Sequence, residues 1–226
     1  MKLKEFVKHC IEEDVKNGDH STLSCISTDK KGAAQLLVKD CGIIAGIEVA
    51  KEIFKIYDHT LTFKAIKSDG DLVSNGDIVF IVEGSSRSLL TIERLVLNVM
   101  QRMSAIATLT SRYVEKINDL KTKILDTRKT TPLNRFLEKE AVKIGGGFNH
   151  RFGLYDMIML KDNHIDFAGG IKKAIIKANN YKVGNNLKVK IEIETRNLNE
   201  VKEVLSQGGI DRIMLDNFNF KNLREA

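Results

Sequence analysis

Residues that mark several common protein classes are scarce in this sequence. Its three cysteines, Cys10, Cys25 and Cys41, show no C-x-x-C spacing, which argues against a disulfide framework or a zinc site and favours a reducing compartment. Proline occurs once, whereas apolar residues make up 42% of the chain, so a disordered protein is excluded. No segment approaches the ~20 apolar residues of a membrane span, and the first residues do not resemble a signal peptide. A cytoplasmic globular protein without a membrane partner is predicted.

Several catalytic and binding signatures are also missing. The Gly145-Gly146-Gly147 triplet is not followed by the Lys and Ser/Thr of a P-loop, and it lacks the strand-turn-helix context of a dinucleotide site. No G-x-S-x-G motif occurs, and the cysteines have no evident His partner. The net charge is +6, but the basic residues are scattered and not interleaved with aromatics, which disfavours a nucleic-acid partner. Catalysis by positioning and charge stabilisation, without a covalent enzyme intermediate, is predicted.

What the sequence does have is a gathering of cations in its second half. The segments 126–132, 145–151 and 160–164 contain Arg128, Lys129, His150, Arg151 and Lys161. These residues follow apolar runs or lie in glycine-marked turns, where a backbone holds a charged group in a cleft. Cations directed at one site would repel each other unless an anion lay among them. The pattern predicts a substrate that carries several negative charges.

The first half of the chain predicts a small α+β unit. Helices are expected over 3–17, 46–56 and 87–118, strands over 33–39, 43–45, 61–67 and 78–83, and a polar loop around 19–22. On the long helix, an apolar face with Leu90, Leu97, Met100 and Leu109 is expected to pack inward. A polar stripe formed by Arg94, Asn98, Gln101 and Arg102 follows the other side. On its pattern alone, this stripe is interpreted as a solvated face.

Beyond residue 120 the pattern changes to repeated strand–helix units. Strands are expected over 123–127, 157–161, 189–194 and 212–216, with helices over 134–143, 168–180 and 198–207. Near-continuous apolar strands between helices predict a parallel sheet, and strands that end in charged residues favour a barrel, whose chemistry lies at the carboxyl ends of its strands. The expected architecture is an N-terminal α+β sandwich domain over 1–118, followed by an open α/β barrel over 119–226.

Carboxylates lie at or near the ends of the last two predicted strands. Glu192 and Glu194 are two residues apart and therefore point to the same face, and Asp216 ends the next strand. Together they are candidates to hold Mg²⁺, and ion pairs to Arg128 or Lys161 are an equally acceptable interpretation. His150 is interpreted as a substrate anchor more readily than as a general acid or base. A structural role is favoured for His164.

Eight segments in order resemble quinolinate phosphoribosyltransferase, also called nicotinate-nucleotide pyrophosphorylase (carboxylating), over nearly the whole chain. They are 13–22, 42–46, 91–104, 126–132, 145–154, 160–165, 191–194 and 214–218. The resemblance implies a pentosyltransferase that combines quinolinate with phosphoribosyl pyrophosphate to give nicotinate mononucleotide, pyrophosphate and CO₂ in NAD synthesis, with Mg²⁺ as cofactor. Departures include Leu133-Asn134, where the family usually has Gly-Leu. The family's barrel continues beyond the fourth strand with two more units, so an incomplete barrel is expected.

The resemblance also implies roles for individual residues. Arg128, His150, Arg151 and Lys161 would bind the quinolinate carboxylates, and Lys129 would contact phosphate groups. Glu194 and Asp216 would hold the ribose hydroxyls and the metal, which makes Lys129, Lys161, Glu194 and Asp216 the implied catalytic residues. Arg94 would enter the site of a neighbouring subunit in a homodimer or higher oligomer, a revision of the solvated-face interpretation.

Two other functions remain open at this point. One is a shortened, inactive relative that binds a dicarboxylate or only assembles with a partner. The other is a phosphoribosyltransferase-like protein associated with molybdenum use, against which the full set of cations argues.

Overall fold

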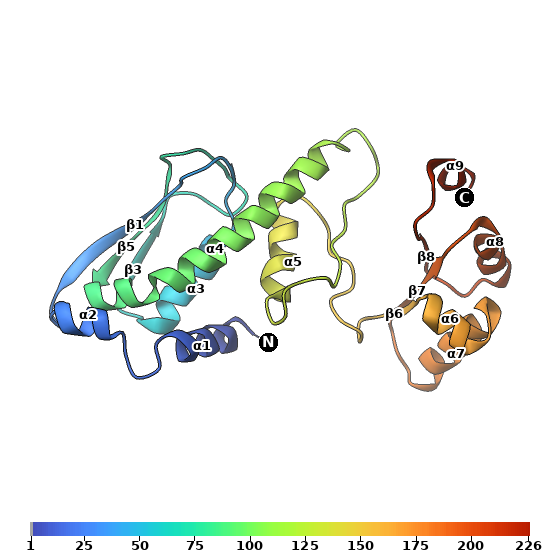
Figure 1. Cartoon of the computed structure of the whole chain (residues 1–226), viewed down its shortest axis with the longest axis horizontal. Helices are drawn as coiled ribbons and strands as arrows, with labels where there is room; N and C mark the ends of the chain where they lie inside the picture. The colour runs from blue at the N-terminus through green and yellow to red at the C-terminus, as the bar shows by residue number, and fades with distance from the viewer. Residues whose placement is uncertain (1) are drawn as a thin grey trace. The chain divides into compact units, whose positions relative to one another are not determined.

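The chain forms two compact units in a computed structural model that describes residues 2–226 (Figure 1). One unit extends to His150 and the other comprises Arg151–Ala226. These units are defined by compactness, which does not have to coincide with the limits of domains. The predicted domain boundary after residue 118 therefore stays a prediction. The N-terminal unit is α+β and the C-terminal unit is α/β with a parallel sheet, which confirms the expected fold class.

The N-terminal unit is built on a three-stranded antiparallel sheet with the order β1-β5-β3, beside a small β2-β4 pair. Its strands are β1 (Lys31–Leu37), β2 (Gly42–Ile43), β3 (Thr62–Ala65), β4 (Leu72–Val73) and β5 (Ile78–Ser85). Its helices are α1 (Leu3–Asp14), α2 (His20–Cys25), α3 (Ile47–Tyr57), α4 (Ser86–Glu115) and α5 (Arg135–Ile144). The predicted helices and strands of this half are therefore confirmed, with bounds shifted by a few residues.

Two secondary-structure predictions for this unit were wrong. The polar loop around 19–22 contains the start of helix α2, because the Asp19 carboxylate accepts a hydrogen bond from the Thr22 backbone N–H at 3.0 Å and caps it. The strand expected over 123–127 is reduced to an isolated parallel bridge between Leu125 and Phe148. The backbone there pairs with the chain at Phe148, whose carbonyl accepts from the Asp126 N–H and whose N–H donates to the Ile124 carbonyl. Most of 123–127 is exposed.

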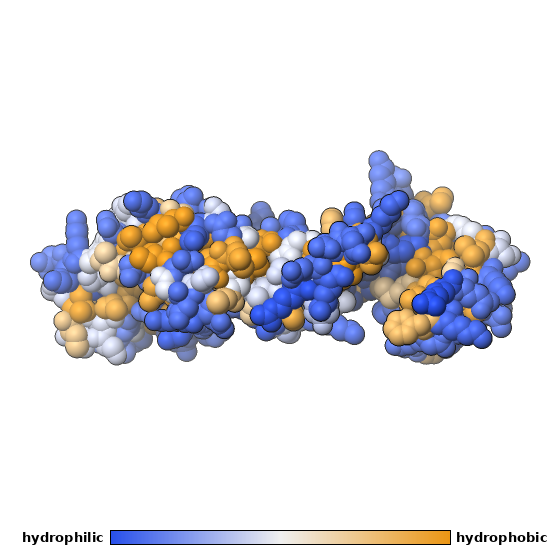
Figure 2. Space-filling model, turned by 90° about the horizontal axis from the view of Figure 1, so that it is seen from above, coloured by the Kyte–Doolittle hydropathy of each residue, from blue (hydrophilic) through white to orange (hydrophobic). Residues whose placement is uncertain are grey.

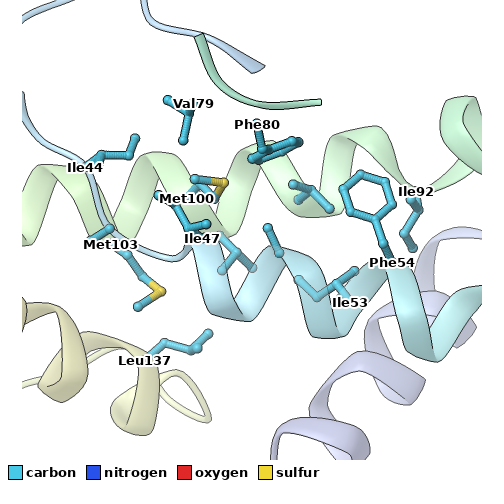
Figure 3. Packing of buried hydrophobic residues seen from close by; sticks show 14 of the residues in the cluster. Ile44, Ile47, Ile53, Phe54, Val79, Phe80, Ile92, Met100, Met103 and Leu137 are labelled. Carbon is cyan, nitrogen blue, oxygen red and sulfur yellow. The ribbon is translucent and has the colours of Figure 1, made fainter. Parts of the chain in front are cut away.

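The core of the N-terminal unit lies between α3, α4, α5 and the sheet (Figure 3). Ile47 and Ile53 of α3, Met103 of α4 and Val79 of β5 are at most 1% exposed. Leu137 of α5 joins the same cluster. Fully burying each such side chain contributes about 1.5–3 kcal/mol, so this cluster fixes α5 against α4.

Helix α4 buries a different face from the predicted one. Met100 is buried as expected, but Leu90 and Leu109 are 47% and 54% exposed. The buried side chains follow Leu89, Ile92, Val96, Val99, Met100, Met103 and Ala107. Both faces carry leucines, so apolar spacing alone did not distinguish them.

The C-terminal unit has a three-stranded parallel sheet with the order β6-β7-β8. Its strands are β6 (Met157–Leu160), β7 (Lys190–Thr195) and β8 (Arg212–Leu215). Its helices are α6 (Asp162–Ala168), α7 (Ile171–Gly184), α8 (Leu198–Gln207) and α9 (Phe220–Glu225). The last three predicted strands and their helices are confirmed, whereas α6 and α9 were not predicted.

The two faces of this sheet differ in chemistry. Ile191 and Ile193 of β7 pack with Leu160 and Ile175 in the apolar cluster on the helix side. The alternate residues Glu192 and Glu194 point to the other face. Glu192 stands beside Met159 and Arg212 in register. The carboxyl ends of the strands therefore carry the polar residues that the sequence predicts for a site.

Within residues 2–226, none of the helices combines the length and the apolar character that crossing a bilayer requires.

Candidate active site

The loop that carries Arg128 and Lys129 is held at its start by Asp126. The Asp126 Oδ1 atom accepts hydrogen bonds from the Lys139 ammonium and from the His150 backbone N–H, the latter at 2.9 Å. Its Oδ2 atom accepts from the Asn149 side-chain amide at 2.5 Å. The Asp126 and Lys139 side chains are 6% and 3% exposed. One buried carboxylate therefore joins the loop of Arg128 to the segment of His150.

A second carboxylate holds the other end of the same loop. Glu138, whose side chain is 8% exposed, accepts from the Thr131 backbone N–H at 3.3 Å. It also accepts from the Nε and Nη2 atoms of Arg102 at 3.1 and 2.9 Å. Sequence reasoning did not single out Glu138 or Lys139. The available signal is a pair of adjacent opposite charges between Leu137 and Ala141, two apolar residues of α5 that are buried.

Arg128 lies on this loop, and its Nε atom is buried without a hydrogen-bond partner among the described residues. A buried donor left unpaired costs roughly 1–3 kcal/mol, and such groups are uncommon in folded proteins. The loop is held at both ends, so moving the Arg128 side chain into solvent would cost free energy. The guanidinium is thus prepared for an acceptor from outside the chain.

The glycine triplet lets the end of α5 pack closely against α4. A Cβ atom at Gly145 would lie 2.4 Å from the Ala107 carbonyl oxygen, and one at Gly147 would lie 2.8 Å from Val142. Gly146 has a φ of +85°. The turn leads directly to Asn149 and His150, which contact Asp126.

We expect Gly145→Ala to lower the free energy of unfolding by about 1–3 kcal/mol, because the Ala107 backbone must move. Thermal or denaturant unfolding measures this loss. Gly184→Ala is the matched control, since beyond the adjoining backbone of its own helix nothing lies within 4 Å of the added Cβ. It should be neutral or stabilising by up to about 1 kcal/mol, because alanine is the better helix residue. Equal effects of the two substitutions would contradict the close approach.

Leu133 stands where the resembling family usually has glycine, and its backbone adopts a conformation that suits glycine. Leu133 has a φ of +66°, a left-handed conformation that suits glycine and costs a β-carbon residue about 1–2 kcal/mol. Its side chain is 73% exposed. The turn after Thr131 therefore keeps the shape that glycine would allow, at the expense of some backbone strain.

In the C-terminal unit, Arg151 and Lys161 are fixed by separate contacts. Arg151 is 8% exposed, and its Nη1 atom donates to the Met157 carbonyl at 3.2 Å. Asp156 accepts from the Phe152 and Gly153 N–H groups at 2.6 and 2.8 Å. Burial alone would raise the pKa of Asp156, but these N–H groups and nearby Arg151 hold it below the usual value. The ionised carboxylate therefore closes this turn at neutral pH. Its contribution to the stability of the fold is lost only as the pH falls through the lowered pKa.

Lys161 directly follows β6, the first strand of the parallel sheet, and contacts the middle strand, β7. Its Nζ atom lies 2.5 Å from Glu194 Oε1, with side-chain exposures of 43% and 13%. His164 Nδ1 accepts from the Lys161 backbone N–H at 2.9 Å, which is the structural role favoured for this histidine. The ion-pair interpretation of Glu194 thus holds for Lys161.

Glu192 has a separate partner, Arg212, which contributes its Nη1 atom at 3.1 Å. The described residues contain no group of three or more His, Cys, Asp or Glu side chains arranged to hold a metal ion. The prediction that three carboxylates converge on one metal site was therefore wrong. Glu192 lies further back along the strand, and Arg212 neutralises its charge. Glu194 and Asp216 still offer the donor type that Mg²⁺ prefers, and Mg²⁺ commonly takes one or two protein carboxylates with water and substrate oxygens.

The predicted site residues thus fall into two groups. Arg94, Arg128, Lys129 and His150 belong to the N-terminal unit, and Arg151, Lys161, Glu194 and Asp216 belong to the C-terminal unit. Within the first group, Asp126 brings the segments of Arg128 and His150 together, whereas Arg94 is exposed on α4. Within the second, Lys161 and Glu194 are in contact, and Asp216 is exposed at the end of β8, where it accepts from Asn217 at 3.0 Å.

Comparisons with known proteins identify the family of the chain. Residues 19–104 match the N-terminal domain of quinolinate phosphoribosyl transferase, and residues 106–226 match its C-terminal domain. The chain is 44% identical to a quinolinate phosphoribosyltransferase [decarboxylating] of Nicotiana tabacum, covering 95% of this chain and 62% of that protein. It is 42% identical to a probable nicotinate-nucleotide pyrophosphorylase [carboxylating] of Bacillus subtilis, covering 96% and 73%.

The structure resembles the NadC protein of Streptococcus pyogenes with a TM-score of 0.92 and 40% identity, over 99% of this chain and 78% of that one. The nicotinate-nucleotide pyrophosphorylase of Francisella tularensis gives a TM-score of 0.89 and 36% identity, over 98% and 76%. The chain spans about three fifths of the length of the plant relatives it matches. Both family domains match along most of the sequence, and the chain belongs to the quinolinate phosphoribosyl transferase family.

Proposed function

We propose that this chain transfers the phosphoribosyl group of phosphoribosyl pyrophosphate to quinolinate, releasing pyrophosphate and CO₂ and forming nicotinate mononucleotide for NAD synthesis. The observation that carries the proposal is Arg128, whose buried Nε atom has no partner among the described residues although its loop is held at both ends. Such a donor suits a carboxylate, which pairs strongly with guanidinium. The names of the relatives supply the same substrate and the loss of CO₂.

In this proposal the two carboxylates of quinolinate bind Arg128, His150, Arg151 and Lys161. Arg151 suits the task because its guanidinium is already oriented by the Met157 carbonyl. Lys161 suits it because Glu194 fixes the ammonium while leaving it 43% exposed. Quinolinate would compete with Glu194 for this lysine, and that exchange places a positive charge beside the incoming anion.

The other substrate is assigned to Lys129, Glu194 and Asp216. Lys129 is exposed on the loop and is free to meet phosphate oxygens. Glu194 and Asp216 accept hydrogen bonds from ribose hydroxyls and are the residues that would hold Mg²⁺. A bound Mg²⁺ would supply charge neutralisation for the pyrophosphate group.

The chemistry then follows from charge. As pyrophosphate leaves, positive charge develops at the ribose carbon, and neighbouring carboxylates of the chain stabilise it. The pyridine nitrogen captures this carbon and becomes a pyridinium. The carbon–carbon bond to the adjacent carboxylate then breaks, CO₂ leaves, and the positive ring nitrogen stabilises the electron pair that stays on the ring carbon. A proton from water adds to that carbon and completes nicotinate mononucleotide. The cations that hold the remaining carboxylate keep the ring in place.

The oligomer in this proposal is a homodimer or higher assembly in which Arg94 enters the neighbouring site. Arg94 lies on α4, which also exposes Leu90 and Leu109. An open groove lined by Leu36, Leu37, Leu90, Val96 and Leu97 runs between β1 and α4. In Figure 2 hydrophobic residues in orange lie exposed on the N-terminal unit. Apolar surface beside a cation suits contact with a second copy of this chain.

One assay tests the proposed reaction. We expect the chain, with quinolinate, phosphoribosyl pyrophosphate and Mg²⁺, to form nicotinate mononucleotide, and Arg151→Ala to reduce the rate by about 100-fold or more, because a charged pair is lost. Omitting Mg²⁺ should also reduce the rate. Quinolinate binding without turnover, abolished by Arg151→Ala, would favour the inactive dicarboxylate binder. A chain that neither binds quinolinate nor turns it over would contradict both.

A cytoplasmic location belongs to the same proposal. The names of some plant relatives place them in mitochondria or chloroplasts, and that of the Bacillus subtilis relative states no compartment. Cys25 and Cys41 are exposed free thiols, which suits a reducing compartment such as the cytoplasm.

A further inference from the structure

Two adjacent residues of α5, Glu138 and Lys139, carry opposite charges and are nearly excluded from solvent. They are 6% and 3% exposed. Each contacts one end of the loop 126–131: Lys139 binds Asp126, and Glu138 accepts from the Thr131 N–H. Arg128 and Lys129 lie between these two points. A single turn of one helix therefore fixes both ends of the loop that presents two predicted substrate cations.

Stability alone is a weak reason for this arrangement. Removing a charge from water costs several kcal/mol, and well-packed apolar residues often replace a buried ion pair without loss of stability. An apolar pair would fill the space but would supply no directed contact to the loop. The ionic groups define direction, because each oxygen and each N–H has a specific partner.

The contacts of Lys139 also reach the segment of His150. Besides binding Asp126, its Nζ atom donates to the His150 carbonyl at 3.1 Å. The His150 N–H donates to the same Asp126 oxygen that Lys139 binds. The Asn149 amide bridges Asp126 and the Lys139 carbonyl, at 2.5 and 2.9 Å. Lys139 thus sets the position of Arg128 relative to the His150 backbone.

Glu138 extends the same control to the long helix. Both contacts of Arg102 to this carboxylate use Oε1, and Oε2 is left for the Thr131 N–H. Arg102 also donates to the Thr131 hydroxyl at 3.3 Å. The loop end is therefore bound to α5 directly and to α4 through Arg102.

We infer that Glu138 and Lys139 are positioning residues that hold Arg128 and His150 in the geometry needed to bind the dicarboxylate. The inference rests on the proposed function for the identity of that ligand. Neither residue touches substrate. At metal sites, replacing the groups that orient the direct ligands typically changes affinity or activity 10–100-fold, and we expect an effect of similar size here.

The test compares buried and exposed charges of the same helix. Glu138→Gln keeps the shape, but whichever way the amide lies, one of its two acceptor positions becomes a donor facing another donor. Lys139→Met removes the ammonium and keeps the length of the side chain. Glu140→Gln and Lys143→Met are the matched controls, since these residues form an exposed ion pair at 2.8 Å with 52% exposure on each side.

We expect Glu138→Gln and Lys139→Met to raise the dissociation constant of quinolinate about 10–100-fold, while the controls change it less than about twofold. Calorimetric titration well below each unfolding midpoint measures this, so that only folded protein is compared. Amide hydrogen exchange in 126–131 should accelerate in the two buried variants and not in the controls. If Lys139→Met does not fold, Glu138→Gln carries the comparison.

A second measurement asks whether Glu138 acts through Arg128. In an Arg128→Met background, adding Glu138→Gln should weaken binding by less than about twofold, because the group being positioned is already absent. Equal losses in both backgrounds, or folded variants with lower melting temperatures and unchanged quinolinate affinity, would overturn the inference. If the parent chain itself binds no quinolinate, the proposed function fails, and loop exchange alone then tests whether the two residues hold the loop.

Discussion

An equal mixture of the Arg94→Ala and Lys161→Ala variants is expected to regain activity that neither variant has alone. Each substitution removes a cation that faces an anionic substrate, and losing such a contact lowers the rate about 10²–10³-fold. If Arg94 serves the neighbouring site, a mixed dimer has one site with both defects and one site with neither. The second site is intact.

Simple pairing statistics set the size of the recovery. Random exchange between two variants of a two-fold dimer makes half of the dimers mixed, so about one quarter of all sites are intact. The rate of the mixture should therefore approach about one quarter of the parental rate after subunit exchange. Mild denaturation followed by refolding of the two variants together ensures that exchange takes place.

The controls for this experiment are the two variants refolded separately and a mixture of two independently prepared Lys161→Ala samples. All should stay inactive. Separate residual activities that merely average on mixing would show that Arg94 and Lys161 act within one chain. Arg102 on α4 pairs with Glu138 of its own chain. Arg94 on the same helix is exposed, which agrees with its binding substrate in the neighbouring subunit.

Replacing Arg128 by methionine is expected to separate affinity from stability. Quinolinate binding should weaken about 100-fold or more, because a charge-assisted contact is lost. The free energy of unfolding of the ligand-free protein should rise by about 1 kcal/mol, because the substitution removes a buried donor without a partner. Methionine has similar length and no polar group that requires one.

Calorimetric titration and chemical denaturation measure the two effects on the same samples. Arg112→Met is the control, since Arg112 is an exposed residue of α4. It should leave both quantities nearly unchanged. A variant that loses stability together with affinity would show that Arg128 supports the fold, and the Nε atom would then not mark the ligand site.

Much of the fold was predictable because local patterns and tertiary packing agree. The strands β7 and β8 alternate or run apolar between glycine-rich or polar turns, and α8 was predicted at its observed bounds, Leu198–Gln207. Helix α4 was predicted in place but not in orientation. Its exposed leucines, Leu90 and Leu109, have the same chemistry as the buried Leu89, so only the packing of α3 and α5 decides which face is inside.

Some residues of the candidate site could also be predicted from the sequence, and others could not. Cations such as Arg128 and Lys161 stand out in the sequence because they end apolar runs or lie in glycine-rich segments. Glu138 and Lys139 do not, because charged residues on a helix are usually exposed. Their partners, Asp126 and Thr131, are seven to thirteen residues away along the chain, and this pairing depends on the loop geometry that brings the ends back to α5.

Isoleucines and glutamates alternate along β7, and this pattern affects how the parallel sheet assembles. Sliding this strand by one residue past β6 or β8 would press Glu192 and Glu194 into the aliphatic cluster and turn Ile191 and Ile193 outward. Each misplaced carboxylate would also lose its basic partner, Arg212 or Lys161. Misaligned pairings are therefore heavily penalised on both sides of the sheet, and the assembling chain has a single favourable alignment for its central strand.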